Sequence, residues 1–166
     1  MSLIPGLLQT EAYARALFAN HWPPVDDETV DERTAARLER QHLLARKPPV
    51  AFSFVLYEAA LRAPLGGRQA HREQLQHLLD VGTLRNVSLQ VLPFERALSV
   101  GTIGPMVLLE SQERDRFAYS TGQSISQLTA DPDVVSSHAG RLSMIRAEAL
   151  NAEESAVFIK RMVDEL

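Results

Sequence analysis

Two glutamates follow apolar stretches that have the composition of β-strands. Glu58 comes directly after residues 50–57, and Glu110 ends residues 106–110. If both strands end at one edge of a sheet, the two carboxylates could act as an acid and a base or hold a divalent cation. This leaves open a small metal-dependent or acid/base hydrolase that uses Glu58 and Glu110. A charge at a strand end is more commonly solvated or paired with an arginine such as Arg62, and we favour that interpretation, so we predict no catalytic residue.

The other common catalytic and metal-binding patterns are missing from the sequence. Because the chain has no cysteine, thiolate zinc sites, iron–sulfur clusters and cysteine nucleophiles are excluded. The five histidines show neither the H-x-x-x-H nor the H-E-x-x-H spacing of helical zinc sites. Gly66 and Gly67 precede a predicted helix, but both phosphate-loop patterns are missing, and a tight turn explains the two glycines. We therefore predict no metal and no cofactor.

One basic cluster is visible in the sequence. Arg33, Arg37 and Arg40 are spaced so that they share one side of a predicted helix, and they are candidates for binding an anion or an acidic partner. Three acidic residues offset this ridge: Asp31, Glu32 and Glu39. We favour a solvated helix face that is crossed by salt bridges.

The composition is that of a globular domain. The 166 residues include 45% hydrophobic residues, and 17 Lys and Arg against 21 Asp and Glu give a formal net charge of −4. A duplex-binding domain is usually basic, so direct DNA binding by this chain ranks lowest among the functions considered. No apolar stretch approaches the roughly 20 residues that span a bilayer. The N-terminus also lacks the pattern of a signal peptide, so we expect a cytoplasmic protein without a membrane partner.

Helix caps and apolar spacing predict five helices, at residues 10–20, 26–45, 68–81, 131–150 and 151–166. Thr10 and Asp131 are placed as N-caps, and Asn151 and Glu154 have the spacing of a capping box. Trp22 lies in a proline-flanked loop, where we expect it to cover the core; an aromatic wall for a small ligand is the less favoured alternative.

Four strands are predicted, at residues 50–57, 87–92, 106–110 and 116–120. The first two flank a helix and form a βαβ unit, and a short polar turn makes the last two an antiparallel hairpin. The fold class is α+β: a single domain over residues 1–166, with a small four-stranded mixed sheet that contains the βαβ unit and the hairpin and is flanked by N- and C-terminal helices.

The order of several residues resembles a known family. Residues 4–17 read I-P-G-L-L-Q-T-E-A-Y-A-R-A-L, residues 33–44 read R-x-x-A-R-L-E-R-Q-x-L-L, and residues 91–94 read V-L-P-F. This pattern resembles the C-terminal domain of unassigned function in actinobacterial Xre-type helix-turn-helix transcription regulators. In that family the P-G-L-L-Q-T segment follows the DNA-binding domain. Here it lies almost at residue 1, so we expect this chain to be an excised C-terminal domain or a member of the family that lacks the DNA-binding part.

The resemblance implies a non-enzymatic regulatory domain that senses a small-molecule effector or mediates protein–protein contact. An effector pocket is expected near the carboxyl ends of the first two strands, bounded by Glu58, Arg62 and Phe94, with Tyr119 as a further ligand-binding candidate. The expected protein partner is a second copy, with the terminal helices as the seam of a homodimer, or a small regulatory protein. DNA would be contacted through the missing N-terminal domain alone.

Overall fold

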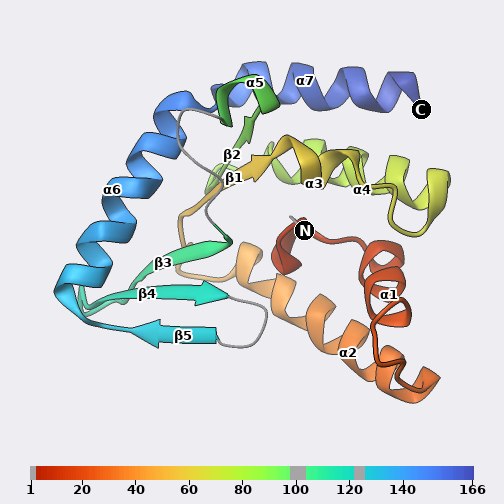
Figure 1. Ribbon diagram of the computed structural model, residues 1–166, viewed down its shortest axis with the longest axis horizontal. Helices are drawn as coiled ribbons and strands as arrows, with labels where there is room; N and C mark the ends of the chain where they lie inside the picture. The colour runs from red at the N-terminus through yellow and green to blue at the C-terminus, as the bar shows by residue number, and fades with distance from the viewer. Residues whose placement is uncertain (1–2, 98–103, 122–125) are drawn as a thin grey trace.

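The computed structural model describes residues 3–97, 104–121 and 126–166, which form an α+β fold (Figure 1). In chain order its elements are η1 (Gly6–Leu8), α1 (Glu11–Ala19), α2 (Asp27–Arg40), η2 (Gln41–Ala45), β1 (Phe52–Tyr57), α3 (Glu58–Arg62), α4 (Gly67–Val81), β2 (Val87–Leu92), α5 (Phe94–Ala97), β3 (Met106–Glu110), β4 (Arg116–Thr121), β5 (Ser126–Thr129), α6 (Pro132–Glu148) and α7 (Ala152–Glu165).

The predicted helix caps are confirmed. The side chains of Thr10 and Asp131 accept hydrogen bonds from backbone N–H groups in the first turns of α1 and α6. Asn151 and Glu154 form the complete capping box that begins α7. The prediction for Trp22 is wrong, because its side chain is 86% exposed and covers no core.

The strands form two separate sheets. β1 and β2 pair in parallel from Phe52 opposite Val87 to Tyr57 opposite Leu92, which confirms the βαβ unit. β3 and β4 form the predicted antiparallel hairpin, and the unpredicted strand β5 pairs with β4. The single four-stranded mixed sheet is therefore wrong: the described strands form a parallel pair and an antiparallel sheet of order β3-β4-β5.

Hydrogen bonds from the junction between α6 and α7 occupy part of the outer edge of β2. The backbone N–H of Val91 donates to Ser155 Oγ at 2.9 Å, and the Val91 carbonyl accepts from Leu150 N at 2.8 Å. Gln90 Nε2 adds a bond of 2.9 Å to the Leu150 carbonyl. At Val91 the junction between α6 and α7 thus takes the hydrogen-bonding groups that a third strand on this edge would need.

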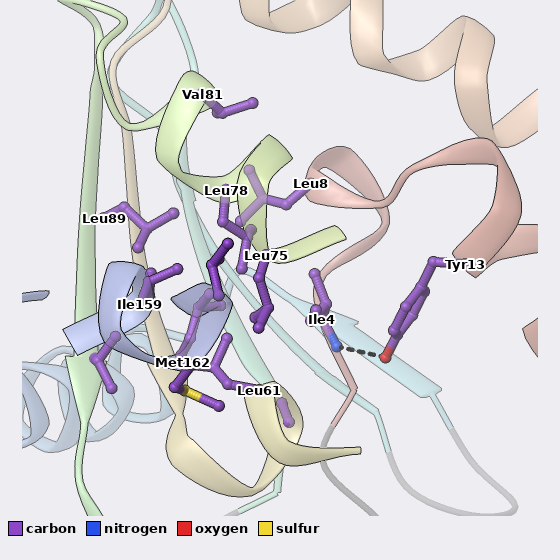
Figure 2. Packing of buried hydrophobic residues seen from close by; sticks show 14 of the residues in the cluster. Ile4, Leu8, Tyr13, Leu61, Leu75, Leu78, Val81, Leu89, Ile159 and Met162 are labelled. Atoms are coloured by element: carbon purple, nitrogen blue, oxygen red, sulfur yellow. Dashed lines mark hydrogen bonds between the residues drawn. The ribbon is translucent and has the colours of Figure 1, made fainter. Parts of the chain in front are cut away.

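The hydrophobic core lies between the parallel pair and the helices around it (Figure 2). Leu75 and Leu78 of α4 are almost fully buried, and Ile159 of α7 is packed in the same cluster. The described residues of β3, β4, β5 and α6 contribute nothing to this cluster. The antiparallel sheet packs instead on α6, which connects it to the rest of the molecule (Figure 1).

The segment with the P-G-L-L-Q-T sequence is held inside the fold by glutamine side chains. Gln74, which is fully buried, donates to the Leu8 carbonyl at 2.7 Å and accepts from Thr10 N at 2.8 Å. Gln41 donates to the carbonyls of Gly6 and Gln9 at 3.1 and 2.6 Å. These backbone groups lack the hydrogen bonds of a regular helix or sheet, and the amide side chains of Gln41 and Gln74 supply them instead. This sequence segment therefore has a structural role.

Candidate functional site

The carboxyl ends of β1 and β2 bring Glu58, Arg62 and Phe94 together, as the strand order predicts. Glu58 begins α3 directly after β1 and is 4% exposed. Its Oε1 accepts from Arg62 Nε at 2.6 Å, and its Oε2 accepts from the Phe94 backbone N–H at 2.8 Å. Both carboxylate oxygens are therefore engaged within the fold, which gives Glu58 the role of joining α3 to the end of β2.

Arg62 and Phe94 form the accessible side of this group. The guanidinium of Arg62 lies 5.9 Å from the centre of the Phe94 ring, and the Tyr57 ring meets Phe94 edge to face at 5.4 Å. Arg62 is half-exposed, and within the described part of the chain its Nη groups have no hydrogen-bond partner. Such a group can bind an anion beside an aromatic surface.

Glu110 lies in the other sheet. Its Oε2 accepts from Arg116 Nε at 2.8 Å across the β3–β4 hairpin, and both side chains are at least half exposed. In the described residues no contact joins the carboxylates of Glu58 and Glu110, and each has its own arginine. No three His, Asp or Glu side chains in residues 3–97, 104–121 and 126–166 are grouped so that they could hold a metal ion.

The three arginines of the predicted basic ridge do not share one exposed surface. Arg37 is half-buried: its Nη1 donates to Gln9 Oε1 at 2.8 Å, and its guanidinium lies 4.6 Å above the centre of the Phe18 ring. Burial lowers the pKa of Arg37, with a further contribution from Arg40. Arg33 and Arg40 are exposed, so the ridge presents two cations rather than three. Arg37 joins α2 to α1 and the segment before it.

Tyr119 lies on β4, in the sheet that does not hold Glu58. Hydrogen bonds to the side chains of Ser126 and Thr121 lower the pKa of its phenol. The residue belongs to a different surface, which the sequence analysis did not identify.

This surface is one face of the β3–β4–β5 sheet, which we call the apolar sheet face and define by five residues: Val107, Leu109, Phe117, Tyr119 and Leu128. Val107 pairs with Tyr119, and Tyr119 pairs with Leu128, so these three side chains form a row across the sheet. Leu109 and Phe117 form a second pair beside the row. The face contains no charged side chain.

The apolar sheet face is open, whereas α6 covers the other face. Val107, Leu109 and Leu128 are 54, 55 and 65% exposed. On the opposite face Ala118 is 1% exposed, and Ser120 Oγ hydrogen-bonds with His138 Nε2 of α6 at 2.8 Å. An antiparallel sheet normally turns its polar side chains to water and its apolar side chains to the core. Here apolar side chains face solvent.

The residues of the apolar sheet face come from three strands, so no single stretch of the sequence indicates it. The alternation of Val107 and Leu109 within β3 is readable from the sequence, but β5 has four residues, of which Leu128 alone is a large apolar residue. So short a strand has no recognisable period of its own. Its pairing with β4 is what places Leu128 beside Tyr119.

The terminal helices, predicted as the seam of a homodimer, pack largely within the chain. α7 contacts α4 and β2, and its Ile159, Met162 and Val163 are buried. A shallow groove between α7 and α4 includes Leu79 and Val157, the latter 61% exposed, with charged side chains around them. No helix in the described ranges combines the length and apolarity needed to cross a membrane.

A family described as a domain of unknown function, DUF5753, matches residues 1–161. No curated protein and no solved structure gives a significant match.

Proposed function

The chain belongs to the DUF5753 family of domains of unknown function, and we propose that it is a non-enzymatic regulatory domain of a bacterial transcription regulator that acts through protein–protein contact at the apolar sheet face. The regulator assignment rests on the resemblance of residues 4–17, 33–44 and 91–94 to actinobacterial Xre-type regulators. Contact with DNA would belong to a helix-turn-helix outside this chain, and the protein would act in the cytoplasm.

The apolar sheet face carries the proposal. Contiguous apolar surface on a protein commonly marks a contact site for another macromolecule. The row of Val107, Tyr119 and Leu128 spans all three strands, and its two outer side chains are 54 and 65% exposed. An aromatic residue at the centre of such a face is typical of protein interfaces.

The charges of the chain support a protein partner over nucleic acid. The net charge is −4, and the apolar sheet face offers no cation to a phosphate backbone. A hydrolase that uses Glu58 and Glu110 would need the two carboxylates at one site. Each is instead paired with its own arginine, so this alternative has no supporting geometry.

Effector binding at Glu58, Arg62 and Phe94 is a second candidate function. The Nη groups of Arg62, which have no hydrogen-bond partner among the described residues, and the 40% exposed Phe94 side chain suit a small carboxylate with an apolar part. Titration calorimetry with such carboxylates tests it: binding should be lost in Arg62→Gln. Absence of binding to the unmodified chain would remove this candidate.

The proposed function is tested in the bacterium that carries the gene. The chromosomal gene is altered to encode Leu128→Glu, and transcript levels in this strain are compared with those in a strain that lacks the gene. Leu128→Glu should reproduce most of the transcript changes of the deletion, because a carboxylate cannot enter an apolar contact without a large desolvation cost. Protein levels are measured in parallel to show that the variant accumulates.

The matched control is Val157→Glu, which places the same charge on an equally exposed apolar residue of α7. It should leave transcripts unchanged. The proposal fails if deletion of the gene changes no transcripts, or if Leu128→Glu behaves like the unmodified gene.

A further inference from the structure

We infer that the partner that covers the apolar sheet face is a second copy of this chain, so that two β3–β4–β5 sheets pack face to face. The inference rests on the proposed contact function of that face and specifies its partner. Three features support it: the missing layer over the sheet, the absence of charge on its face, and the symmetry of the exposed row.

The first feature is the missing layer. α6 already covers one face of the sheet, so the apolar side chains that lack a cover are those of the other face; stacked sheets lie about 10 Å apart with their side chains interdigitated. The side of the sheet that carries Ala118 packs on α6, while the other side presents Val107, Leu109 and Leu128 to solvent. A second sheet of the same length would cover all three side chains.

The second feature is charge. The apolar sheet face has no charged side chain, so two identical faces meet without like-charge contacts. Away from this face the chain has a net charge of −4, which makes random contacts between copies repulsive. A strongly basic or acidic partner would find no opposite charge on the face, whereas an identical copy needs none.

The third feature is symmetry. Tyr119 lies on the central strand, between Val107 on β3 and Leu128 on β5. A two-fold axis that runs along β4 between the two sheets would place Tyr119 opposite Tyr119. It would also place Val107 of one copy opposite Leu128 of the other, which is the reciprocal pairing that a two-fold interface requires. The Glu110–Arg116 ion pair lies on the opposite face, together with Ala118, and takes no part in the contact.

Sedimentation equilibrium of the purified chain over a wide concentration range tests the inference. We expect a reversible dimer, and Leu128→Arg or Val107→Glu should each raise the dissociation constant at least tenfold. Val157→Arg, on α7, should change it less than twofold. Far-UV circular dichroism and the urea midpoint show whether each variant is folded. We expect all three variants to fold, because the three side chains are exposed.

Mixing the two face variants tests the symmetry. In a mixed pair the new Arg at 128 lies opposite the new Glu at 107, while the remaining contact of Val107 with Leu128 is unaltered. The mixture should dimerise more tightly than either variant alone. If the mixture dimerises as weakly as each variant alone, the proposed two-fold arrangement is wrong.

The inference as a whole is overturned if the unmodified chain stays monomeric at the highest concentration, or if Leu128→Arg dimerises like the unmodified chain. Failure of the dimer inference can be distinguished from failure of the proposed contact function. A monomeric chain in which Leu128→Glu still changes transcripts would show that the face binds a different protein, whereas unchanged transcripts would reject the contact function itself.

Discussion

At the scale of single residues, Glu58 shows how a candidate catalytic group can have a structural role. Its position after β1, and its nearness to Arg62 and Phe94, are predictable because parallel strands end at one edge of a sheet. The engagement of both its oxygens is not predictable, since it depends on how α5 follows β2. The sequence locates this group of residues but leaves the role of each one open.

Removal of the Glu58 side chain tests this structural role. In Glu58→Ala the Phe94 N–H and the Arg62 guanidinium lose their acceptors. We expect the free energy of unfolding to fall by about 1–3 kcal/mol, which is the usual contribution of hydrogen bonds to a charged group. Glu110→Ala removes a half-exposed ion pair and should cost about 1 kcal/mol or less. Urea denaturation compares the two variants, and an equal loss of unfolding free energy in both would contradict the structural role of Glu58.

We expect two histidines of α4 to make the free energy of unfolding depend on pH. Burial lowers the pKa of His71, and burial also lowers the pKa of His77 against an opposing effect of Asp80. Within the described residues His71 Nδ1 and His77 Nε2 have no hydrogen-bond partner. Below the unfolded pKa of about 6.5 the unfolded chain therefore binds more protons than the folded chain.

The free energy of unfolding should accordingly be constant above about pH 6.5 and fall as the pH drops toward the lowered pKa values, by at most about 1.4 kcal/mol per pH unit for each histidine. His71→Gln should make this decline shallower. Urea unfolding at pH 7.5, 6.5 and 5.5 measures it. An identical pH dependence in His71→Gln and the unmodified chain would show that His71 does not contribute.

At the scale of elements, the βαβ unit, the hairpin and all five long helices are predictable because each has a local signal: a cap, an apolar period or a turn. The division into two sheets has no such signal. The bonds that Ser155 and Leu150 make to Val91 contribute to it, and they join residues more than 50 positions apart along the chain. The strand β5 is too short to show a period, and it was missed together with the apolar sheet face that it completes.

The edge of β2 gives a test at this scale. Ser155→Ala removes the acceptor of the Val91 N–H, and both residues are fully buried. We expect a loss of about 1–3 kcal/mol in the free energy of unfolding. Ser136→Ala, at an exposed position of α6, should stay within about 0.5 kcal/mol of the unmodified chain. If Ser155→Ala is as stable as Ser136→Ala, the junction between α6 and α7 does not secure this edge.

At the scale of the whole molecule, the segments that carry the family resemblance are largely structural. The P-G-L-L-Q-T segment is enclosed by Gln41 and Gln74, and Arg37 of the second segment packs on Phe18. Glu58, Arg62 and Phe94 remain the candidate ligand group. The apolar sheet face lies outside all of these segments, on a sheet that adds nothing to the main core. The fold thus combines a packed core, built from η1, α4, α7 and the parallel pair, with a separate apolar surface for which we propose a contact function.

The central claim is that a protein covers the apolar sheet face in the cell. Site-specific photo-crosslinking tests it most directly: a photoreactive amino acid replaces Leu128 or, as the control, Val157 in the bacterium that carries the gene. Irradiation should join position 128 to a protein, and mass spectrometry of the adduct shows whether that protein is a second copy. Position 157 should give little adduct. If position 128 forms no more adduct than position 157 at equal protein levels, the face is uncovered and the claim is wrong.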